Sequence, residues 1–334
     1  MLSNTSSNNF ISQHIGTSEF VLIAYYPLFL IIIGTILNTN TFIVLCRSPF
    51  RDTKKQPAMH YMRTMAIFDI LILYGWNLDH YLSSVHGFKL LIYSIPSCKW
   101  VNFLSFSTTQ ISAWLRVFVC FDRYLSLSRL SRTWFSKSKT ILIIIALIIS
   151  IFLLLNFHLL LFACYIDADG NINPNAVQYT IYPMWDRFHL VLYNCLPFIL
   201  MVIFDSGVIY HLIHLRRRTT LQNSRIQHRS ISITLVVTST LFLIMTIPSG
   251  VVFAFFLEIS PLSVPKIVDG IYFTYHILSF PLYMITFTEF RREFIGMIYC
   301  AQRDRVVPVN NPAFIPPTTA ATFRLKTVAT VATN

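Results

Sequence analysis

A charged triplet, Asp122-Arg123-Tyr124, closes an apolar stretch of the sequence. The stretch covers residues 111–121 and is interrupted only by Ser112 and Arg116. A fixed charge at the edge of a membrane is costly unless another group compensates it. Asp122 and Arg123 can compensate each other through a charge-assisted hydrogen bond at the end of a helix. The simpler alternative is an interfacial Arg123 whose side chain snorkels toward water.

Arg116 is the more unusual charge, because it lies deeper in the same apolar stretch. It precedes Arg123 by seven positions, which is two helical turns, so both side chains lie on one helix face. An unpaired guanidinium is not expected in a low-dielectric interior. Two carboxylates, Asp69 and Asp205, lie in other apolar stretches within reach. We therefore predict an ion pair between Arg116 and one of them; a water-solvated Arg116 is the alternative.

Asp69 also needs partners of its own. An ionised carboxylate in mid-membrane costs several kcal/mol unless it meets water, a cation or hydrogen-bond donors. Asn38, Ser112 and Ser279 are natural donors. The plainest interpretation of this mid-membrane polar set is a group of interhelical hydrogen bonds that holds a helix bundle together.

The composition identifies the medium in which these charges lie. The 334 residues are 54% hydrophobic and only 12% charged, with a mean hydropathy of +0.59, 29 Phe and 15 Pro. This composition does not suit a soluble domain. We therefore predict an all-α membrane protein, a bundle of seven transmembrane helices with a short amphipathic helix on the membrane surface.

Seven segments are long enough to cross a bilayer, which takes about 20 residues. They cover residues 20–46, 61–82, 99–125, 140–162, 188–213, 231–257 and 267–287. The second and third of these carry charged or polar side chains, so hydropathy alone supports them weakly. Those side chains must face other helices or a cavity.

The basic residues give the predicted orientation. Of the 26 Lys and Arg residues, 21 lie in residues 47–63, 123–139, 216–229 and 291–334. The positive-inside rule places these segments in the cytoplasm and the N-terminus outside, so seven spans leave the C-terminus inside. We expect a multi-pass protein of the plasma membrane. The net charge of +12 fits an inner surface that faces anionic membrane lipids, and it requires no nucleic-acid partner.

The chain is expected to have four parts. They are an extracellular tail of residues 1–19, the bundle of residues 20–288, an amphipathic cytoplasmic helix of residues 289–300 and a disordered tail of residues 301–334. Asn4 begins the single N-x-S/T site and can be glycosylated in the outer tail. Cys300, at the end of the amphipathic helix, is a candidate for palmitoylation, with a free thiol as the alternative.

The order and spacing of several residues resemble the rhodopsin-like G-protein-coupled receptors. The residues that carry the resemblance are Asn38 with Arg47, Met65-Ala66-Ile67-Phe68-Asp69, Cys98, Ser112, Asp122-Arg123-Tyr124, Pro197, Phe242, Pro248, Tyr283 and Phe290-Arg291-Arg292. It covers the chain from about residue 28 to residue 300. Two departures concern the activation switch: Thr246 stands where the family has Trp, and Ser279-Phe280 where it has Asn-Pro.

The resemblance implies a switch at the cytoplasmic side. By this resemblance, the pair formed by Asp122 and Arg123, next to Tyr124, would restrain the resting state of the protein. The pair would be released when a heterotrimeric G protein docks. Phe242 and Pro248 would belong to the moving sixth span. Tyr283 would be the switch tyrosine of the seventh span.

The resemblance also implies a disulfide and an ion site. The disulfide would join Cys98 and Cys164, with two free thiols as the alternative. Asp69 would line a hydrated cavity that can hold a sodium ion, and we expect Arg116 to replace or exclude that ion. The outer loop of residues 167–183 contains a turn signal at 169–171 and is compatible with a β-hairpin.

The outer ends of the spans give the expected ligand class. Ser105 stands where amine receptors place Asp, and residues 267–287 contain no Lys that could bind retinal. The residues expected at the ligand pocket are Trp76, Asp79, Ser105, Asp269 and Tyr272. Acidic and aromatic side chains suit a short peptide that carries Arg and aromatic groups. A solvated outer rim with an aromatic belt is the alternative.

We therefore expect a receptor that transmits binding of an extracellular ligand, a short neuropeptide, to a heterotrimeric G protein, without a cofactor. The alternatives are an orphan receptor for a non-peptide small molecule and a membrane transporter. A transporter normally shows a repeated half with broken helices, and no internal similarity is visible. An enzyme is not expected, because the histidines are scattered over several spans without a metal-binding spacing.

Overall fold

The computed structural model describes residues 17–47, 50, 57–128, 137–179, 181–218, 223–256, 259–261 and 263–303. Asn4, residues 304–334 and the side chain of Cys300 lie outside what is described. The expected glycosylation, disordered tail and palmitoylation therefore stay predictions. The chain divides into two units, residues 1–295 and residues 296–334.

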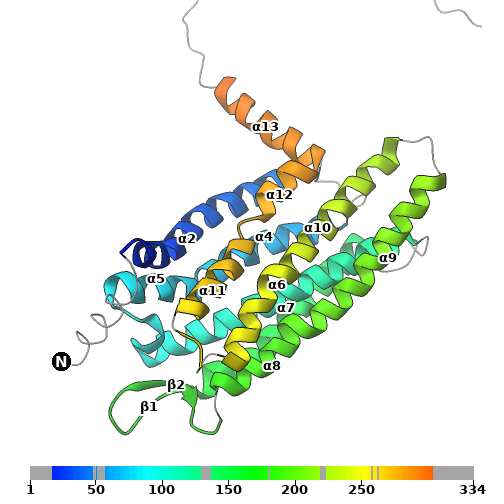
Figure 1. Ribbon diagram of the computed structural model, residues 1–334. Helices are drawn as coiled ribbons and strands as arrows, with labels where there is room; N and C mark the ends of the chain where they lie inside the picture. Colours follow the sequence, from blue (N-terminus) through cyan, green and yellow to red (C-terminus); the bar gives the residue numbers. More distant parts are fainter. Residues whose placement is uncertain are drawn as a thin grey trace, which may run out of the picture. The chain divides into compact units, whose positions relative to one another are not determined.

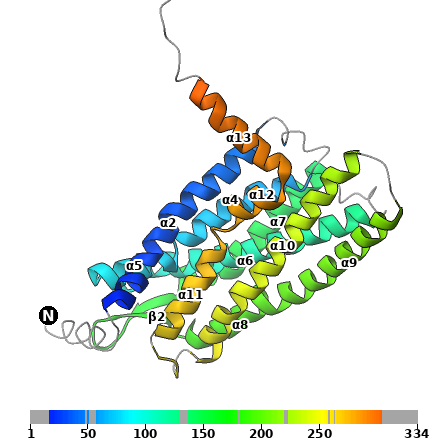
Figure 2. The ribbon, with the colours of Figure 1, turned by 45° about the horizontal axis from the view of Figure 1, so that its top comes forward.

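The described residues are mostly helical, and the helices of the first unit pack side by side in both views (Figure 1, Figure 2). The long helices are α2 (Thr17–Leu45), α6 (Ile95–Leu127), α7 (Ser138–Phe162), α9 (Leu196–Arg218) and α10 (Asn223–Val251). The shorter helices are α4 (Met59–Leu73), α5 (Trp76–His86), α8 (Asp186–Leu190), α11 (Ser263–Tyr275), α12 (Ser279–Thr286) and α13 (Thr288–Arg303). Short 3₁₀ or π-helical turns occupy Leu90–Ile92, Ile181–Trp185, Val191–Cys195 and Val252–Phe256.

Four helical segments of the described chain are long and apolar enough to cross a membrane. They are Ile23–Leu45, Ser138–Phe162, Arg187–His214 and Ile231–Phe256. They coincide within a few residues with four of the predicted spans. The chain is therefore mainly helical, and four of its segments have the length and composition of membrane spans.

The three other predicted spans depart from this simple pattern. α6 is long, but its polar side chains lower its hydropathy. Residues 61–82 are not one helix, because α4 ends at Leu73 and α5 begins at Trp76. Residues 267–287 are divided between α11 and α12. Each of the last two predicted spans is therefore divided between two helices, and these interruptions were not predicted.

The break between α11 and α12 has a local cause. Pro281 has no backbone N–H and cannot continue the hydrogen bonds of the preceding helical turn. The backbone N–H groups of His276, Ile277 and Leu278 instead donate to carbonyls three residues back, at 3.0–3.1 Å. The carbonyl of His276 accepts a 2.8 Å hydrogen bond from Nδ2 of Asn38 on α2. Although the helix is interrupted here, the buried carbonyl of His276 still has a hydrogen-bond partner.

α6 is the central helix of the first unit. It contacts α4, α7, α9 and α10, which lie around it (Figure 2). Every residue from Ser105 to Ala113 on α6 is buried. Its Ser, Thr and Gln side chains therefore face protein rather than the surroundings of the bundle, which makes a polar helix tolerable there.

Residues 163–176 form a two-stranded antiparallel hairpin. Its strands are β1 (Ala163–Ile166) and β2 (Ile172–Ala176). In the turn, Oδ1 of Asp167 accepts a hydrogen bond from the backbone N–H of Asn171 at 2.8 Å. Gly170 has a φ of 82°, which glycine adopts without a steric penalty. The turn signal at residues 169–171 thus lies at the tip of a hairpin.

The predicted disulfide between Cys98 and Cys164 is present and confirmed. It joins the beginning of α6 to the first strand of the hairpin. Nδ2 of Asn102, one helical turn further along α6, lies 3.6 Å from the sulfur of Cys164. The hairpin is therefore attached covalently to the central helix.

α13 covers the predicted amphipathic helix and extends three residues beyond residue 300. In the first unit, Phe290 is fully buried, and its ring lies 5.8 Å from that of Phe280 and 5.5 Å from that of Tyr283. These contacts fix the beginning of α13 to α12. That the helix lies on a membrane surface stays a prediction.

The close approach of α4 and α6 generates a first prediction. A Cβ on Gly75, between α4 and α5, would lie 2.6 Å from Oγ of Ser105. We expect Gly75→Ala to lower the free energy of unfolding by about 1–3 kcal/mol through overpacking. Thermal unfolding of the purified protein measures this effect.

Adding Ser105→Ala to Gly75→Ala should restore most of the lost stability, because the remaining Cβ of residue 105 is 3.5 Å away. Gly296→Ala is the matched control, since nothing lies within 4 Å of its Cβ position. Equal melting temperatures of the Gly75→Ala and Gly296→Ala variants would contradict the close approach.

Candidate functional site

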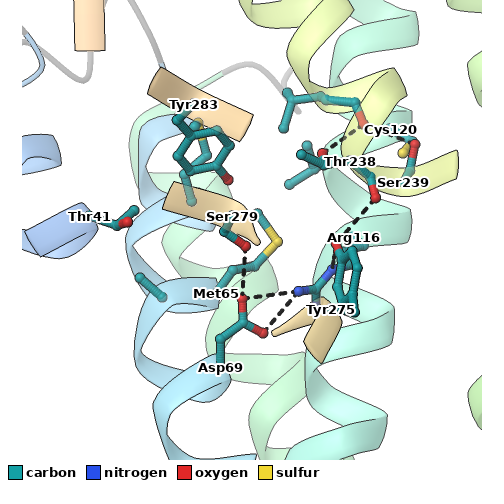
Figure 3. A pocket seen from close by; sticks show the side chains of 14 residues that line it. Thr41, Met65, Asp69, Arg116, Cys120, Thr238, Ser239, Tyr275, Ser279 and Tyr283 are labelled. Atoms are coloured by element: carbon teal, nitrogen blue, oxygen red, sulfur yellow. Dashed lines mark hydrogen bonds and ion pairs between the residues drawn. The ribbon is translucent and has the colours of Figure 1, made fainter. Parts of the chain in front are cut away.

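An ion pair between Asp69 of α4 and Arg116 of α6 forms the centre of the candidate site (Figure 3). Nη2 of Arg116 lies 2.9 Å from Oδ1 and 3.1 Å from Oδ2 of Asp69. Asp69 is 1% exposed and Arg116 is 5% exposed. Of the two carboxylates expected within reach of Arg116, the structure therefore pairs it with Asp69.

Three further side chains donate hydrogen bonds to the Asp69 carboxylate. They are Ser112 Oγ at 3.2 Å, His276 Nδ1 at 2.8 Å and Ser279 Oγ at 3.4 Å. Asn38 was expected to be a donor to Asp69, but its amide instead bonds to the carbonyl of His276. It therefore supports the site indirectly, by holding the chain between α11 and α12.

His276 was not predicted as a partner of Asp69. Its position, three residues before Ser279, is the spacing of one helical turn and could have pointed to it. The segment between α11 and α12 turns tightly at His276, and this turn was not predicted. The imidazole is fully buried beside the carboxylate.

The guanidinium of Arg116 also connects α6 to α10 and α11. Its Nε donates to the hydroxyl of Tyr275 at 2.9 Å, and that hydroxyl donates to the carbonyl of Thr238 at 3.2 Å. Cζ of Arg116 lies 4.9 Å from the ring centres of Phe242 and Tyr275, which is a favourable cation–π distance. Arg116 therefore connects its own helix α6 to α4, α10 and α11.

The remaining space beside the ion pair is small. The cavity has a volume of about 10 Å³. Its lining includes Thr41, Met65, Cys120, Ser239 and Tyr283 (Figure 3). A cavity of this size holds roughly one water molecule. The positive charge that compensates Asp69 is the guanidinium of Arg116, which is covalently part of the chain.

Asp205 of α9 belongs to a different polar cluster. The hydroxyl of Ser239 on α10 donates a hydrogen bond to its carboxylate, and the thiol of Cys120 on α6 also bonds to it. Among the described residues, no hydrogen bond or ion pair joins Asp205 to Arg116. Arg116 is therefore not paired with Asp205, although Cys120 and Ser239, the partners of Asp205, line the small cavity beside Asp69. The cluster instead joins α6, α9 and α10.

At the end of α6 opposite the disulfide, Asp122 and Arg123 form the expected ion pair. Nη2 and Nε of Arg123 lie 2.6 Å and 3.2 Å from Oδ2 of Asp122. Arg123 is 4% exposed, so it does not extend into the surroundings. Tyr124 packs against α9, where its ring lies 6.2 Å from that of Phe204 and directly over Gly207.

The other residues expected in the switch lie on α10 and α12. Phe242 packs against the guanidinium of Arg116, and Pro248 lies inside α10. Tyr283 is buried and lines the cavity beside the ion pair. The hydroxyl of Thr246 donates to the carbonyl of Phe242 at 2.8 Å, within the same helix.

A second cavity, with a volume of about 50 Å³, lies toward the hairpin end of the helices. Four of the residues expected at the ligand pocket line it, and the sequence analysis missed His189 and Tyr193. The expected residues are Trp76, Ser105, Asp269 and Tyr272. Asp79 does not line it, because its carboxylate accepts a hydrogen bond from the backbone N–H of Leu91 at 3.1 Å. Asp79 therefore lies outside this cavity, and its expected place in a ligand pocket stays a prediction.

A row of aromatic rings leads from this cavity to Arg116. The ring of Tyr272 lies 6.1 Å from that of Tyr193, which lies 5.8 Å from that of Phe242. Phe242 in turn contacts the guanidinium. A displacement of the rings in this cavity can therefore act on the ion pair through direct contacts.

No protein-family model matches the chain, and no curated protein is significantly similar to it. The geometry of the site and the spacing of its residues are therefore the basis for assigning a function.

The ion pair generates a prediction on stability. Arg116→Leu leaves the buried carboxylate of Asp69 without its cation, and we expect a loss of about 3–5 kcal/mol in the free energy of unfolding. Thermal unfolding of the purified protein measures the loss. The double variant Asp69→Asn, Arg116→Leu should recover most of it, because the buried charge is gone.

Arg47→Leu is the matched control for this prediction. Arg47 forms a 3.8 Å ion pair with Glu293, and its side chain is 41% exposed. We expect a loss below about 1 kcal/mol. A double variant as unstable as Arg116→Leu alone would show that the guanidinium stabilises the bundle by packing rather than by its charge.

The same pair generates a prediction on sodium. The native protein should have the same melting temperature in sodium chloride and in N-methylglucamine chloride, because Arg116 already compensates Asp69. In Arg116→Leu, sodium should raise the melting temperature, since the carboxylate and its hydroxyl donors become available to the ion. A sodium effect of equal size in both proteins would contradict the idea that Arg116 replaces the ion.

Proposed function

We propose that the chain is a seven-helix receptor of the rhodopsin-like type. It lies in the plasma membrane with its N-terminus outside and its C-terminus in the cytoplasm. It converts binding of an extracellular ligand at the cavity near the hairpin into an opening around Arg123, where a heterotrimeric G protein docks.

One observation carries the proposal: a continuous set of contacts joins the cavity at the hairpin end to the polar core of the bundle. Tyr272, Tyr193 and Phe242 lead to Arg116, and Arg116 is paired with Asp69. The buried pair of Asp122 and Arg123 lies two turns further along α6. A binding site, a coupling element and a buried charged pair at the other end are the parts that a signalling receptor requires.

Three further crossings complete the seven spans of the proposal. α6, with 33 residues, is about 50 Å long, more than the roughly 30 Å of a bilayer core. α4 with α5, and α11 with α12, form the other two as interrupted helices. Their charged residues Asp69 and Asp269 are buried against other helices, which is the condition for charges at membrane depth.

The proposed mechanism is a population shift between two arrangements of α10. Ligand contacts at the outer cavity favour an arrangement in which α10, pivoting at Pro248, moves outward at its cytoplasmic end. That movement separates Ser239 from Asp205 and exposes Arg123. The hydrogen bond between Ser239 and Asp205 favours the closed arrangement.

The ligand class proposed first is a short peptide that carries Arg and aromatic side chains. The buried carboxylate of Asp269 and the rings of Trp76 and Tyr272 support it, because carboxylates bind guanidinium groups and rings pack on rings. The second candidate is a non-peptide small molecule. The cavity volume of about 50 Å³ favours a small molecule, because the cavity accepts only a small group in this arrangement of the helices.

The test is guanine-nucleotide exchange on a panel of purified G proteins, measured with the receptor in lipid nanodiscs and a library of short amidated peptides. We expect a peptide response that Arg123→Ala and Asp269→Asn both abolish. Lys99→Ala is the matched control, because Lys99 lies at the outer end of α6, the helix that carries Arg123. This variant should respond to the peptide normally. Substrate flux into proteoliposomes without nucleotide exchange would instead identify a transporter.

A further inference from the structure

A third cavity, larger than the other two, lies between α2, α5 and α11. Its volume is about 240 Å³. α2 contacts both α5 and α11, and His80 of α5 lies close to Asp269 of α11 (Figure 1, Figure 2). Apolar residues form much of its wall, among them Tyr26, Pro27, Ile267 and Ile271. An apolar cavity of about 150 Å³ already binds a benzene-sized molecule, so this one has room for a ring with a short chain.

A buried carboxylate lies in the wall of this cavity. Asp269 is 4% exposed and lines both this cavity and the outer cavity of about 50 Å³. Its Oδ1 accepts a 3.0 Å hydrogen bond from Ser249. No hydrogen-bond donor in the described part of the chain reaches its Oδ2. A buried carboxylate oxygen without a donor strongly favours a cationic partner.

The two basic groups beside this cavity compensate Asp269 only weakly. Nδ1 of His80 lies 3.5 Å from Oδ2, beyond a good hydrogen-bond distance, and its charge depends on protonation. Lys266 also lines the cavity, but no ion pair joins it to Asp269 among the described residues. Burial, and to a lesser extent the charge of Lys89, lower the pKa of Lys266. Space for a further cation therefore adjoins the carboxylate.

We propose that this cavity binds a small lipophilic ammonium ion, whose nitrogen pairs with Oδ2 of Asp269 and whose apolar part lies between α2 and α11. The inference deepens the proposed function, because Asp269 also lines the outer cavity of the receptor. Binding itself requires neither the G protein nor the switch at Arg123. An ammonium ion here would act on Asp269 from the second of the two cavities that this residue lines.

Gly270 provides a way to fill this cavity without changing the outer one. A Cβ at Gly270 would lie 3.4 Å from the ring of Tyr26, an ordinary contact, and Gly270 lines only the cavity between α2, α5 and α11. Gly270→Ala and Gly270→Val therefore place one and then three carbon atoms into its space. Asp269→Asn keeps the shape of the side chain and removes the charge.

The experiment measures the melting temperature of the receptor in lipid nanodiscs as 4-phenylbutylammonium is added, with 4-phenylbutanol as the neutral probe. We expect saturable stabilisation by the ammonium ion, and binding of the alcohol weaker by about 10-fold or more. Asp269→Asn should lose this preference. Gly270→Ala should weaken binding and Gly270→Val should abolish it. Asp79→Asn, a carboxylate that lines neither cavity, is the control and should bind normally.

Equal stabilisation by the two probes, or unchanged binding by both Gly270 variants, would overturn the proposal. Gly270→Ala keeps the test decisive if Gly270→Val does not fold, because its added methyl group makes only an ordinary contact. Arg123→Ala separates this proposal from the proposed function. That variant should bind the probe as the native protein does, whether or not any G protein responds.

Discussion

A buried positive charge next to a buried negative charge determines much of this structure. Neither Asp69 nor Arg116 is stable alone in a low-dielectric interior, so the helices that carry them must remain in contact. α4 and α6 bring the two charges together, and the residues around α11 and α12 supply His276, Ser279 and Tyr275. Alternative packings that separate the two charges are strongly disfavoured. The ion pair therefore acts more on the specificity of helix packing than on its total stability.

The position of the pair on α6 explains why this helix looks unlike a membrane helix. Between Ser105 and Ala113 this helix buries its whole circumference, so hydropathy does not determine which side chains it can carry there. Gln110 illustrates the point. It is fully buried, accepts a 2.6 Å hydrogen bond from Asn156 of α7 and bonds to His189 at 3.1 Å. Polar residues on α6 thus connect neighbouring helices at several depths.

The sequence predicted the parts of the structure that depend on local pattern or on strong pairwise rules. The four apolar helices follow from hydropathy, the disulfide followed from a family resemblance, and the need for a partner of Arg116 follows from electrostatics. The choice between Asp69 and Asp205 could not be predicted, because it depends on the rotation of α4 and α9 around their axes. The breaks in two spans were missed for a similar reason. Pro281 permits a break, but the tertiary contact from Asn38 satisfies the backbone there.

The covalent attachment of Arg116 also has an electrical consequence. A free ion that enters or leaves a site within a membrane moves charge through the transmembrane field, at a cost of about 2.3 kcal/mol per elementary charge for each 100 mV. The cation beside Asp69 cannot leave, and the two charges of the pair move together with their helices. The pair itself therefore carries almost no net charge through the field when these helices rearrange. At this point in the bundle, the membrane voltage has little influence on the equilibrium between arrangements.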